Sequence, residues 1–86
     1  MVQRTLTVKL DPGLQARPAA QFVQEAVKFS SNIFIEKNQK QVNAKSIMGL
    51  MSLAIAQSET IELIAEGTDE DEALEYLGNI IEQTES

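Results

Sequence analysis

The sequence predicts an α+β fold, an open-faced sandwich in which helices cover one face of a β-sheet. Apolar residues alternate along residues 2–10 and 60–66, whereas residues 16–29 and 69–81 show helical spacing. Strands that are apolar on one face need cover on that face only. The chain has 86 residues, of which 43% are hydrophobic and 23% charged, as is typical of one small globular domain. We therefore expect a single domain, residues 1–86, in the order strand-helix-strand-strand-helix-strand-helix.

The first strand and the first helix are separated by a clear break. The strand's apolar face carries Val2, Leu6, Val8 and Leu10, interrupted by Arg4. Asp11-Pro12-Gly13 ends this strand. The helix is expected from Ala16, with Pro18 in its first turn, where a missing N–H costs least. Its apolar stripe is predicted to hold Ala16, Ala19, Ala20, Val23, Ala26 and Val27, bordered by Phe22 and Phe29.

The remaining elements follow at short intervals. Ser30-Ser31-Asn32 ends the first helix, and residues 33–36 and 41–43 are predicted to form a hairpin around a turn at 37–40. A short helix is expected over 46–53, and a strand over 60–66 with Ile61, Leu63 and Ala65 on one face. In the last helix Asp69 is the expected cap and Glu72 completes a capping box. Its apolar stripe is Ala73, Leu74, Leu77, Ile80 and Ile81.

Composition excludes several classes of function. Thirteen acidic residues outnumber seven basic ones, giving a net charge of −6, which disfavours direct binding to nucleic acid. The chain has no histidine and no cysteine, which removes Ser-His-Asp catalysis, imidazole or thiolate metal ligation, disulfides and phosphohistidine chemistry. No signal peptide is indicated, and no apolar run approaches the roughly 20 residues of a membrane helix. A cytoplasmic protein without a cofactor is expected.

The acidic run at residues 69–72 is interpreted as structural. Acidic side chains in the first turn of a helix are favoured by the helix dipole. The run lacks the glycine-containing pattern of a twelve-residue calcium loop. We therefore expect no metal site there.

Ser46 is the first candidate functional residue. A serine at the start of a short helix is sufficiently explained as an N-cap. However, the helix that follows is too short to turn all its apolar side chains inward. Leu50 and Leu53 suit the core, which leaves Ile47 and Met48 as an exposed patch with Met51 nearby; such patches often mark partner surfaces. A phosphoryl group on Ser46 would add about −1.5 to −2 charge where the helix N-terminus tolerates it.

The second candidate is the stretch GLQARPAA, residues 13–20. The start of its helix, together with Arg17, forms a natural anion site with Gln15 at the mouth. An amide is non-basic and a poor nucleophile, so Gln15 can donate and accept hydrogen bonds but cannot carry phosphate. A polar cap or loop role is enough to explain it.

Both stretches resemble motifs of the HPr family of the bacterial phosphotransferase system. GLQARPAA is similar to the active-site motif G-[IL]-H-A-R-P-A, and NAKSIMGLMSLA, residues 43–54, to the regulatory-serine segment. The resemblance covers essentially the whole chain and implies a four-stranded antiparallel sheet with three helices on one face. Gln15 stands where the family keeps its phosphate-carrying histidine. In this respect the chain resembles the catabolite-repression paralogues, which keep the serine and lack the histidine.

The resemblance also implies partners and roles. Ser46 becomes the site modified by the ATP-dependent HPr kinase/phosphorylase, and catabolite control protein A the repressor that binds the phosphoserine form. Ile47, Met48 and Met51 become docking contacts, Arg17 and Lys45 cations near the phosphate, and Gln15 a neutral contact.

The sequence leaves three candidate functions and two oligomeric states to compare. The missing histidine speaks against a phosphocarrier, and a phosphorylation-dependent co-regulator is the main expectation. The alternative is that the unphosphorylated form binds a metabolic enzyme, for which the resemblance suggests methylglyoxal synthase. The chain is expected as a monomer, with a strand-swapped homodimer as the other state because a hinge at residues 11–13 permits exchange.

Overall fold

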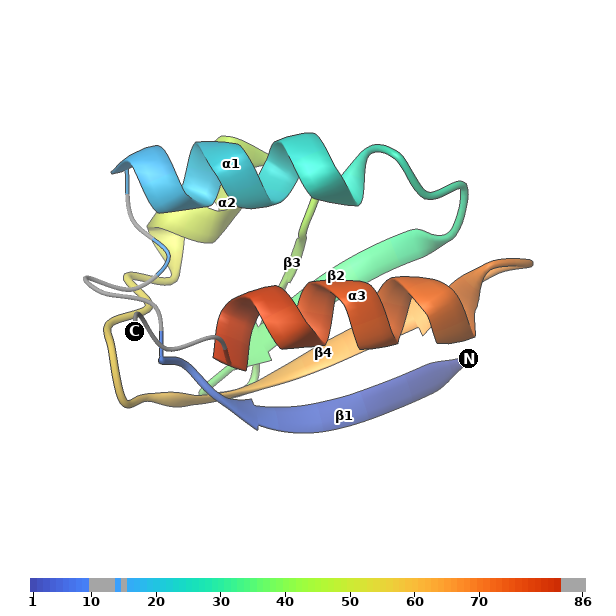
Figure 1. Ribbon diagram of the computed structural model, residues 1–86. Helices are drawn as coiled ribbons and strands as arrows, with labels where there is room; N and C mark the ends of the chain where they lie inside the picture. The colour runs from blue at the N-terminus through green and yellow to red at the C-terminus, as the bar shows by residue number, and fades with distance from the viewer. Residues whose placement is uncertain (10–13, 15, 83–86) are drawn as a thin grey trace.

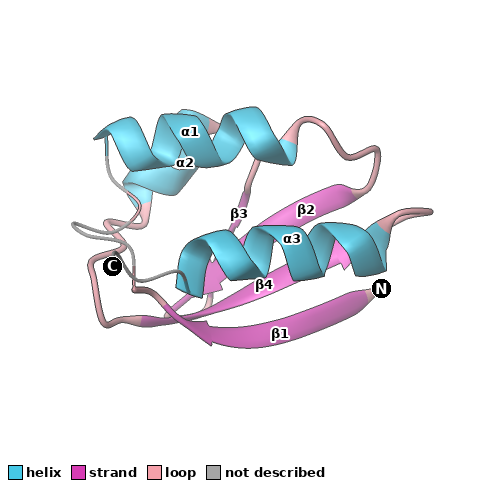
Figure 2. Cartoon of the chain, viewed as in Figure 1, coloured by secondary structure: helices cyan, strands magenta, loops and turns pink. Residues whose placement is uncertain are grey.

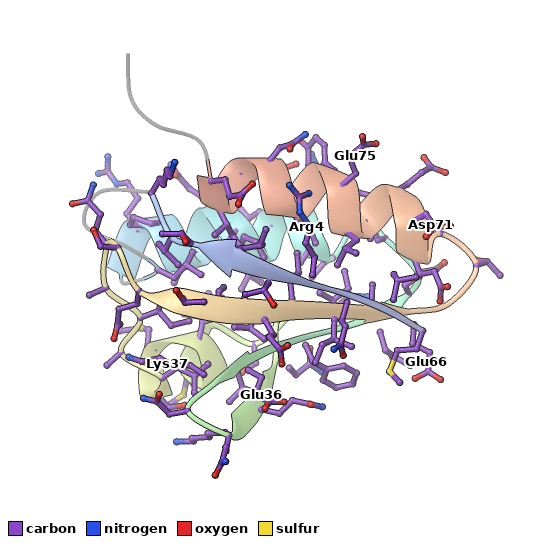
Figure 3. All side chains as sticks on the ribbon, turned by 90° about the horizontal axis from the view of Figure 1, so that it is seen from below. Arg4, Glu36, Lys37, Glu66, Asp71 and Glu75 are labelled. Carbon is purple, nitrogen blue, oxygen red and sulfur yellow. The ribbon has the colours of Figure 1, made fainter. Side chains whose placement is uncertain are left out.

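The computed structural model describes residues 1–9, 14 and 16–82 and confirms the predicted order of elements. The four strands form one antiparallel sheet in the order β1-β4-β2-β3. All helices lie over one face of this sheet (Figures 1 and 2), and Figure 3 shows the strands from the uncovered side. The predicted open-faced sandwich is therefore confirmed. The elements are β1 (Val2–Thr7), α1 (Ala16–Ala26), β2 (Asn32–Lys37), β3 (Lys40–Asn43), α2 (Ile47–Ser52), β4 (Thr60–Glu66) and α3 (Glu70–Glu82).

The core lies between the sheet and the helices. Helix α3 packs on β1 and β4, α2 packs beside β3, and α1 contacts both other helices. The largest fully buried side chains include Leu6, Phe22, Ile33, Ile35, Leu50, Ile61, Leu63, Leu77 and Ile81. Burying a side chain of this kind stabilises the fold by roughly 1.5–3 kcal/mol. The inward face of β4 is the predicted one, with Ile61, Leu63 and Ala65 buried.

Helix α1 differs from its predicted apolar stripe at two positions. Phe22, expected at the border, is 1% exposed, while Val27, expected inside the stripe, is 55% exposed. The cause is the end of the helix at Ala26, since Val27 then lies in the turn that leaves the core. Leu10 and the break at residues 11–13 lie outside the described residues.

Two side chains of the sheet break the simple in-out alternation. Arg4 shares the inward face of β1, where its guanidinium donates to Glu82 Oε1 at 3.0 Å and lies near Gly78 of α3. Ile64, which the alternation places on the outer face, is only 6% exposed and pairs with Phe34 across the β2–β4 ladder. The uncovered face is therefore not purely polar.

The start of α3 differs from the predicted capping box. The Asp69 carboxylate accepts hydrogen bonds from the Ser30 and Ser31 N–H groups, at 2.9 and 3.0 Å, and from the Ser31 hydroxyl. The reciprocal pair is formed instead by Gly67 and Glu70, whose Oε1 accepts from Gly67 N at 3.0 Å. Asp69 does stand at the N-cap position, because its carbonyl accepts from Ala73 N at 2.9 Å. The predicted box with Glu72 differs, since the Asp69 carboxylate connects α3 to the segment before β2.

Candidate functional site

Ser46 is the N-cap of α2, as predicted. Its backbone is extended (φ −113°, ψ 116°), and its Oγ accepts a hydrogen bond from Gly49 N at 3.1 Å. The Ser46 carbonyl accepts the first bond of the helix, from Leu50 N at 3.0 Å. The residue as a whole is partly exposed, and its hydroxyl is held by the cap bond.

The segment before the helix holds Ser46 close to β3. Ser46 N donates to Asn43 O at 3.1 Å, and Asn43 Oδ1 accepts from Lys45 N at 2.8 Å. Between them, Ala44 is fully buried and donates to Ile33 O. A Cβ on Gly49 would lie 3.3 Å from Val42 Cβ and 3.4 Å from both Asn43 O and Ser46 Cβ. Glycine at this position therefore allows α2 to start directly against the sheet.

The apolar side chains of α2 divide as predicted. Leu50 and the following Leu53 are buried, at 0% and 6% exposure. Ile47, Met48 and Met51 are 41%, 82% and 49% exposed and form what we call the α2 patch. The patch begins directly after Ser46, so the capped serine and the exposed apolar side chains belong to one short helical segment.

The candidate cations are held differently. Arg17 is exposed in the first turn of α1, the helix that packs against α2. The Lys45 ammonium donates to Phe29 O at 2.7 Å, so in this state it is engaged with a backbone carbonyl at the end of α1. Gln15 lies outside the described residues.

Lys37 holds the end of α2, a role that its position in the turn predicted at residues 37–40 does not indicate. Its ammonium donates to Leu53 O and Ala54 O, both at 3.0 Å, and to Glu59 Oε1 at 2.8 Å. These bonds cap the C-terminal end of α2, where a cation also complements the helix dipole. The bond from Lys37, with a further one from Ala56 N–H, lowers the pKa of Glu59. Only the fold brings residue 37 to residues 53–54.

Two of the acidic residues at the start of α3, Asp69 and Glu70, make structural contacts. The hydrogen bonds from the Ser31 hydroxyl and the Ser30 N–H lower the pKa of Asp69 to about 2. Glu70 also pairs with the N-terminal ammonium at 3.2 Å. Within residues 1–9, 14 and 16–82, the structure has no group of His, Cys, Asp or Glu side chains suited to holding a metal ion.

The order of the elements and of the strands places this chain among small proteins built like the HPr component of the phosphotransferase system. The family model described as PTS HPr component phosphorylation site matches residues 2–83. The chain belongs to this HPr family.

Named relatives narrow the group further. The HPr-like protein Crh of Halalkalibacterium halodurans is 65% identical over 83 residues, 96% of this chain and 99% of that protein. Crh of Bacillus subtilis is 58% identical, over 96% of this chain and 98% of that protein. The chain is thus a Crh- and HPr-like regulatory paralogue of the phosphotransferase system.

Solved structures agree with the fold. A phosphocarrier protein HPr from Bacillus anthracis superposes with a TM-score of 0.91 at 57% identity, covering 93% of this chain and 95% of that one. The crystal structure of Bacillus subtilis Crh, described as a dimer with a swapping domain, gives 0.76 at 59% identity, over 94% and 93% of the two chains. In the described part of this chain, no helix has the length and apolar character to cross a membrane.

Proposed function

We propose that this protein is a cytoplasmic, single-domain regulator of carbon catabolite repression that acts when Ser46 is phosphorylated. HPr kinase/phosphorylase transfers the γ-phosphoryl group of ATP to Ser46 Oγ, and the phosphoserine form then acts as co-repressor with catabolite control protein A. The observation that carries the proposal is the position of Ser46, a partly exposed N-cap next to the α2 patch, in a chain without histidine.

The N-cap position can accept a phosphate without loss of the fold. Gly49 N–H already points at Ser46 Oγ, and a phosphate oxygen can take over as its acceptor. The first turn of α2 contains no acidic residue, so the added charge of about −1.5 to −2 meets no repulsion from that turn. Phosphorylation would then change the surface charge and leave α2 in place.

The docking surface combines charge with apolar area. The phosphate would make charge-assisted hydrogen bonds with basic groups of the repressor, each contributing about 1.5–3 kcal/mol, and the α2 patch would be buried alongside. Arg17 is exposed and available to such an interface, whereas Lys45 would first have to leave Phe29 O. Gln15 is proposed as a neutral contact, on the resemblance alone.

The absence of histidine argues against a phosphocarrier function. The active-site motif of the family needs a ring nitrogen at the position of Gln15, and the chain has no histidine anywhere. We expect no phosphate transfer from enzyme I and phosphoenolpyruvate to this protein under conditions that label an ordinary HPr.

Site mapping after incubation with HPr kinase/phosphorylase and ATP tests the proposal. We expect the intact mass to rise by one phosphoryl group, located on Ser46. Ser46→Ala removes both the hydroxyl and the cap, so Ser46→Asn is the sharper variant because asparagine also caps helices. Ser52→Ala is the matched control, since Ser52 is an exposed serine of the same helix whose hydroxyl bonds Gly49 O.

The outcomes are distinct. Labelling that persists in Ser46→Asn, or that disappears in Ser52→Ala, would remove Ser46 from its role. The labelled protein should bind catabolite control protein A more tightly than the unlabelled one, in a titration by fluorescence anisotropy. Equal binding of both forms would contradict the co-repressor function even if Ser46 is the modified residue.

A second function has one observation in its favour. The α2 patch is exposed in the unmodified protein, so a docking surface exists without phosphate. The unphosphorylated form would then bind a metabolic enzyme such as methylglyoxal synthase. A pull-down with both forms separates the two functions, because only this alternative predicts binding that phosphate weakens.

For assembly we propose a monomer that exchanges β1 to form a homodimer at high concentration. Among the described strands, β1 lies at the edge of the sheet and pairs with β4, and the dimeric Crh of Bacillus subtilis is described with a swapping domain. Light scattering across a concentration series tests this, and a mass that stays monomeric at millimolar concentration would contradict it.

A further inference from the structure

A shallow hollow of about 280 Å³ lies between the end of α1 and the outer side of α3. It is lined by Phe29, Glu72, Glu75, Tyr76 and Asn79. Helix α1 contacts both other helices, and Figure 1 shows α3 below α1 and α2 partly behind it. The hollow is lined mainly by α3, whereas the α2 patch belongs to α2, so the two features share no residue.

Two aromatic rings form one wall of the hollow. The rings of Phe29 and Tyr76 are 5.8 Å apart and tilted by 54°. The Tyr76 hydroxyl donates to Glu25 Oε1 at 2.8 Å, which also accepts from Lys28 at 3.1 Å. The bond to Glu25 raises the pKa of Tyr76. The wall is held in place by these bonds, yet Tyr76 is 46% exposed.

The two carboxylates of the hollow are unpaired among the residues that the structure describes. Of the described acidic side chains, Glu25 pairs with Lys28, Glu59 with Lys37 and Glu82 with Arg4, whereas several others, such as Glu66 and Asp71, form no ion pair. Glu72 and Glu75 have none, and both are exposed. Glu75 extends outward from α3, away from the strands (Figure 3). Because no Lys or Arg follows Lys45 in the sequence, α3 supplies no cation of its own.

We propose that this hollow receives an arginine side chain from a basic segment of a protein partner. A guanidinium group stacks on aromatic faces and donates in a fork that matches carboxylate oxygens. The Phe29–Tyr76 wall offers the faces, and Glu72 and Glu75 offer the oxygens. The Asn79 side-chain oxygen adds a neutral acceptor. Lysine has the charge but lacks the planar group, so the site should prefer arginine.

The test is an NMR titration of the unphosphorylated chain with three blocked tripeptides, glycine-X-glycine, in which X is arginine, lysine or citrulline. Citrulline has nearly the shape of arginine and no charge. We expect the arginine peptide to shift the amide signals of Phe29, Tyr76 and Asn79, with weak, salt-sensitive binding. The lysine peptide should bind more weakly, and the citrulline peptide should not bind measurably.

Two charge-matched double variants locate the site. Glu72→Gln with Glu75→Gln removes the carboxylates of the hollow, and the expected loss of affinity is roughly threefold to tenfold. Glu66→Gln with Asp71→Asn removes two charges from exposed residues outside the hollow, both labelled in Figure 3, and should change affinity by less than about twofold. Tyr76→Leu removes the ring without changing charge and should abolish the preference for arginine over lysine.

Three results would overturn the proposal. The first is an equal loss of affinity in both double variants, which indicates general attraction to an acidic surface. The second is binding of the citrulline peptide, and the third is a set of shifts centred on another part of the molecule. None of these results bears on phosphorylation of Ser46, so the two proposals fail separately.

Discussion

Replacing Gly78 by alanine should stabilise the protein, although Gly78 is buried in the middle of α3. Glycine costs a helix interior about 0.8–1.0 kcal/mol relative to alanine. The added Cβ would lie 3.7 Å from Leu6 Cδ1, an ordinary contact, and 3.0 Å from Arg4 Nη1, a close one. The sign of the change therefore depends on whether the end of the Arg4 side chain can move.

Arg4 has room to move. Its side chain is 40% exposed, and that of its partner Glu82 is 35% exposed. An ion pair of such exposure contributes about 0–1 kcal/mol, and a small shift of the guanidinium need not break it. We expect Gly78→Ala to raise the free energy of unfolding by about 0.5–1 kcal/mol. This is the gain in helix propensity minus a partial loss of the Arg4–Glu82 ion pair.

Urea unfolding of four chains measures this gain. Gly78→Ala should raise the midpoint by about 0.3–0.8 M without changing the m value. The same substitution in an Arg4→Ala background should give the full propensity gain of about 1 kcal/mol, because the close contact is gone. Loss of stability in both backgrounds would refute the reasoning, since the obstacle would then be the packing of α3 on β1.

Three further predictions follow from the described hydrogen bonds and backbone angles. Lys37→Met removes the ammonium that donates to the Leu53 and Ala54 carbonyls. It should lower the free energy of unfolding, measured with urea, by about 1.5–3 kcal/mol. The control Lys40→Met changes an exposed side chain and should alter this free energy by less than about 0.5 kcal/mol. Ala54→Gly should stabilise the protein by about 1 kcal/mol, because Ala54 has a φ of 51° that glycine adopts without steric cost. Ala20→Gly inside α1 should destabilise it instead. Thermal unfolding of both variants tests the two signs. The pKa of Asp69 falls from 3.8 to about 2 on folding, so its contribution is fully present above about pH 4 and is lost as the pH falls towards 2; Asp69→Asn should lower the melting temperature at pH 6 and flatten its decline between about pH 4 and 2, and an unchanged decline would contradict the assignment.

The fold was predictable because its local signals agree. Alternation in residues 60–66, helical spacing in 69–81 and the cap at Ser46 all hold in the structure. One of the two errors has a local cause, and the other has a tertiary one. Val27 satisfies the helical spacing but lies beyond the end of α1, and spacing alone does not fix where a helix ends. Asp69 has the right residue type for a cap, but its carboxylate is used across the chain by Ser30 and Ser31.

The site was predictable only in the part that is continuous in sequence. Ser46 and the α2 patch are neighbours along the chain, so the length of α2 and the needs of the core were enough to indicate which side chains stay exposed. Lys37 reaches α2 from the end of β2, and the Lys45 ammonium reaches the end of α1. The hollow likewise joins Phe29 to α3. These contacts depend on how elements pack, which the spacing of residues within one segment does not report.

The choice between monomer and strand-swapped dimer also depends on more than the spacing of residues within one segment. The β1–β4 ladder, with Val2 opposite Ala65 and Thr7 opposite Thr60, would have the same hydrogen bonds whether β1 comes from its own chain or from a second copy. Identical contacts cancel in the comparison, so the balance rests on the connection between β1 and α1 and on protein concentration. Val8 and Lys9 mark where that connection begins, since their N–H groups donate to Glu59 O and Ile81 O, both at 2.9 Å. A substitution in the connection between β1 and α1 should shift the monomer–dimer equilibrium, whereas one within the β1–β4 ladder should destabilise both states alike; light scattering across a concentration series measures the difference.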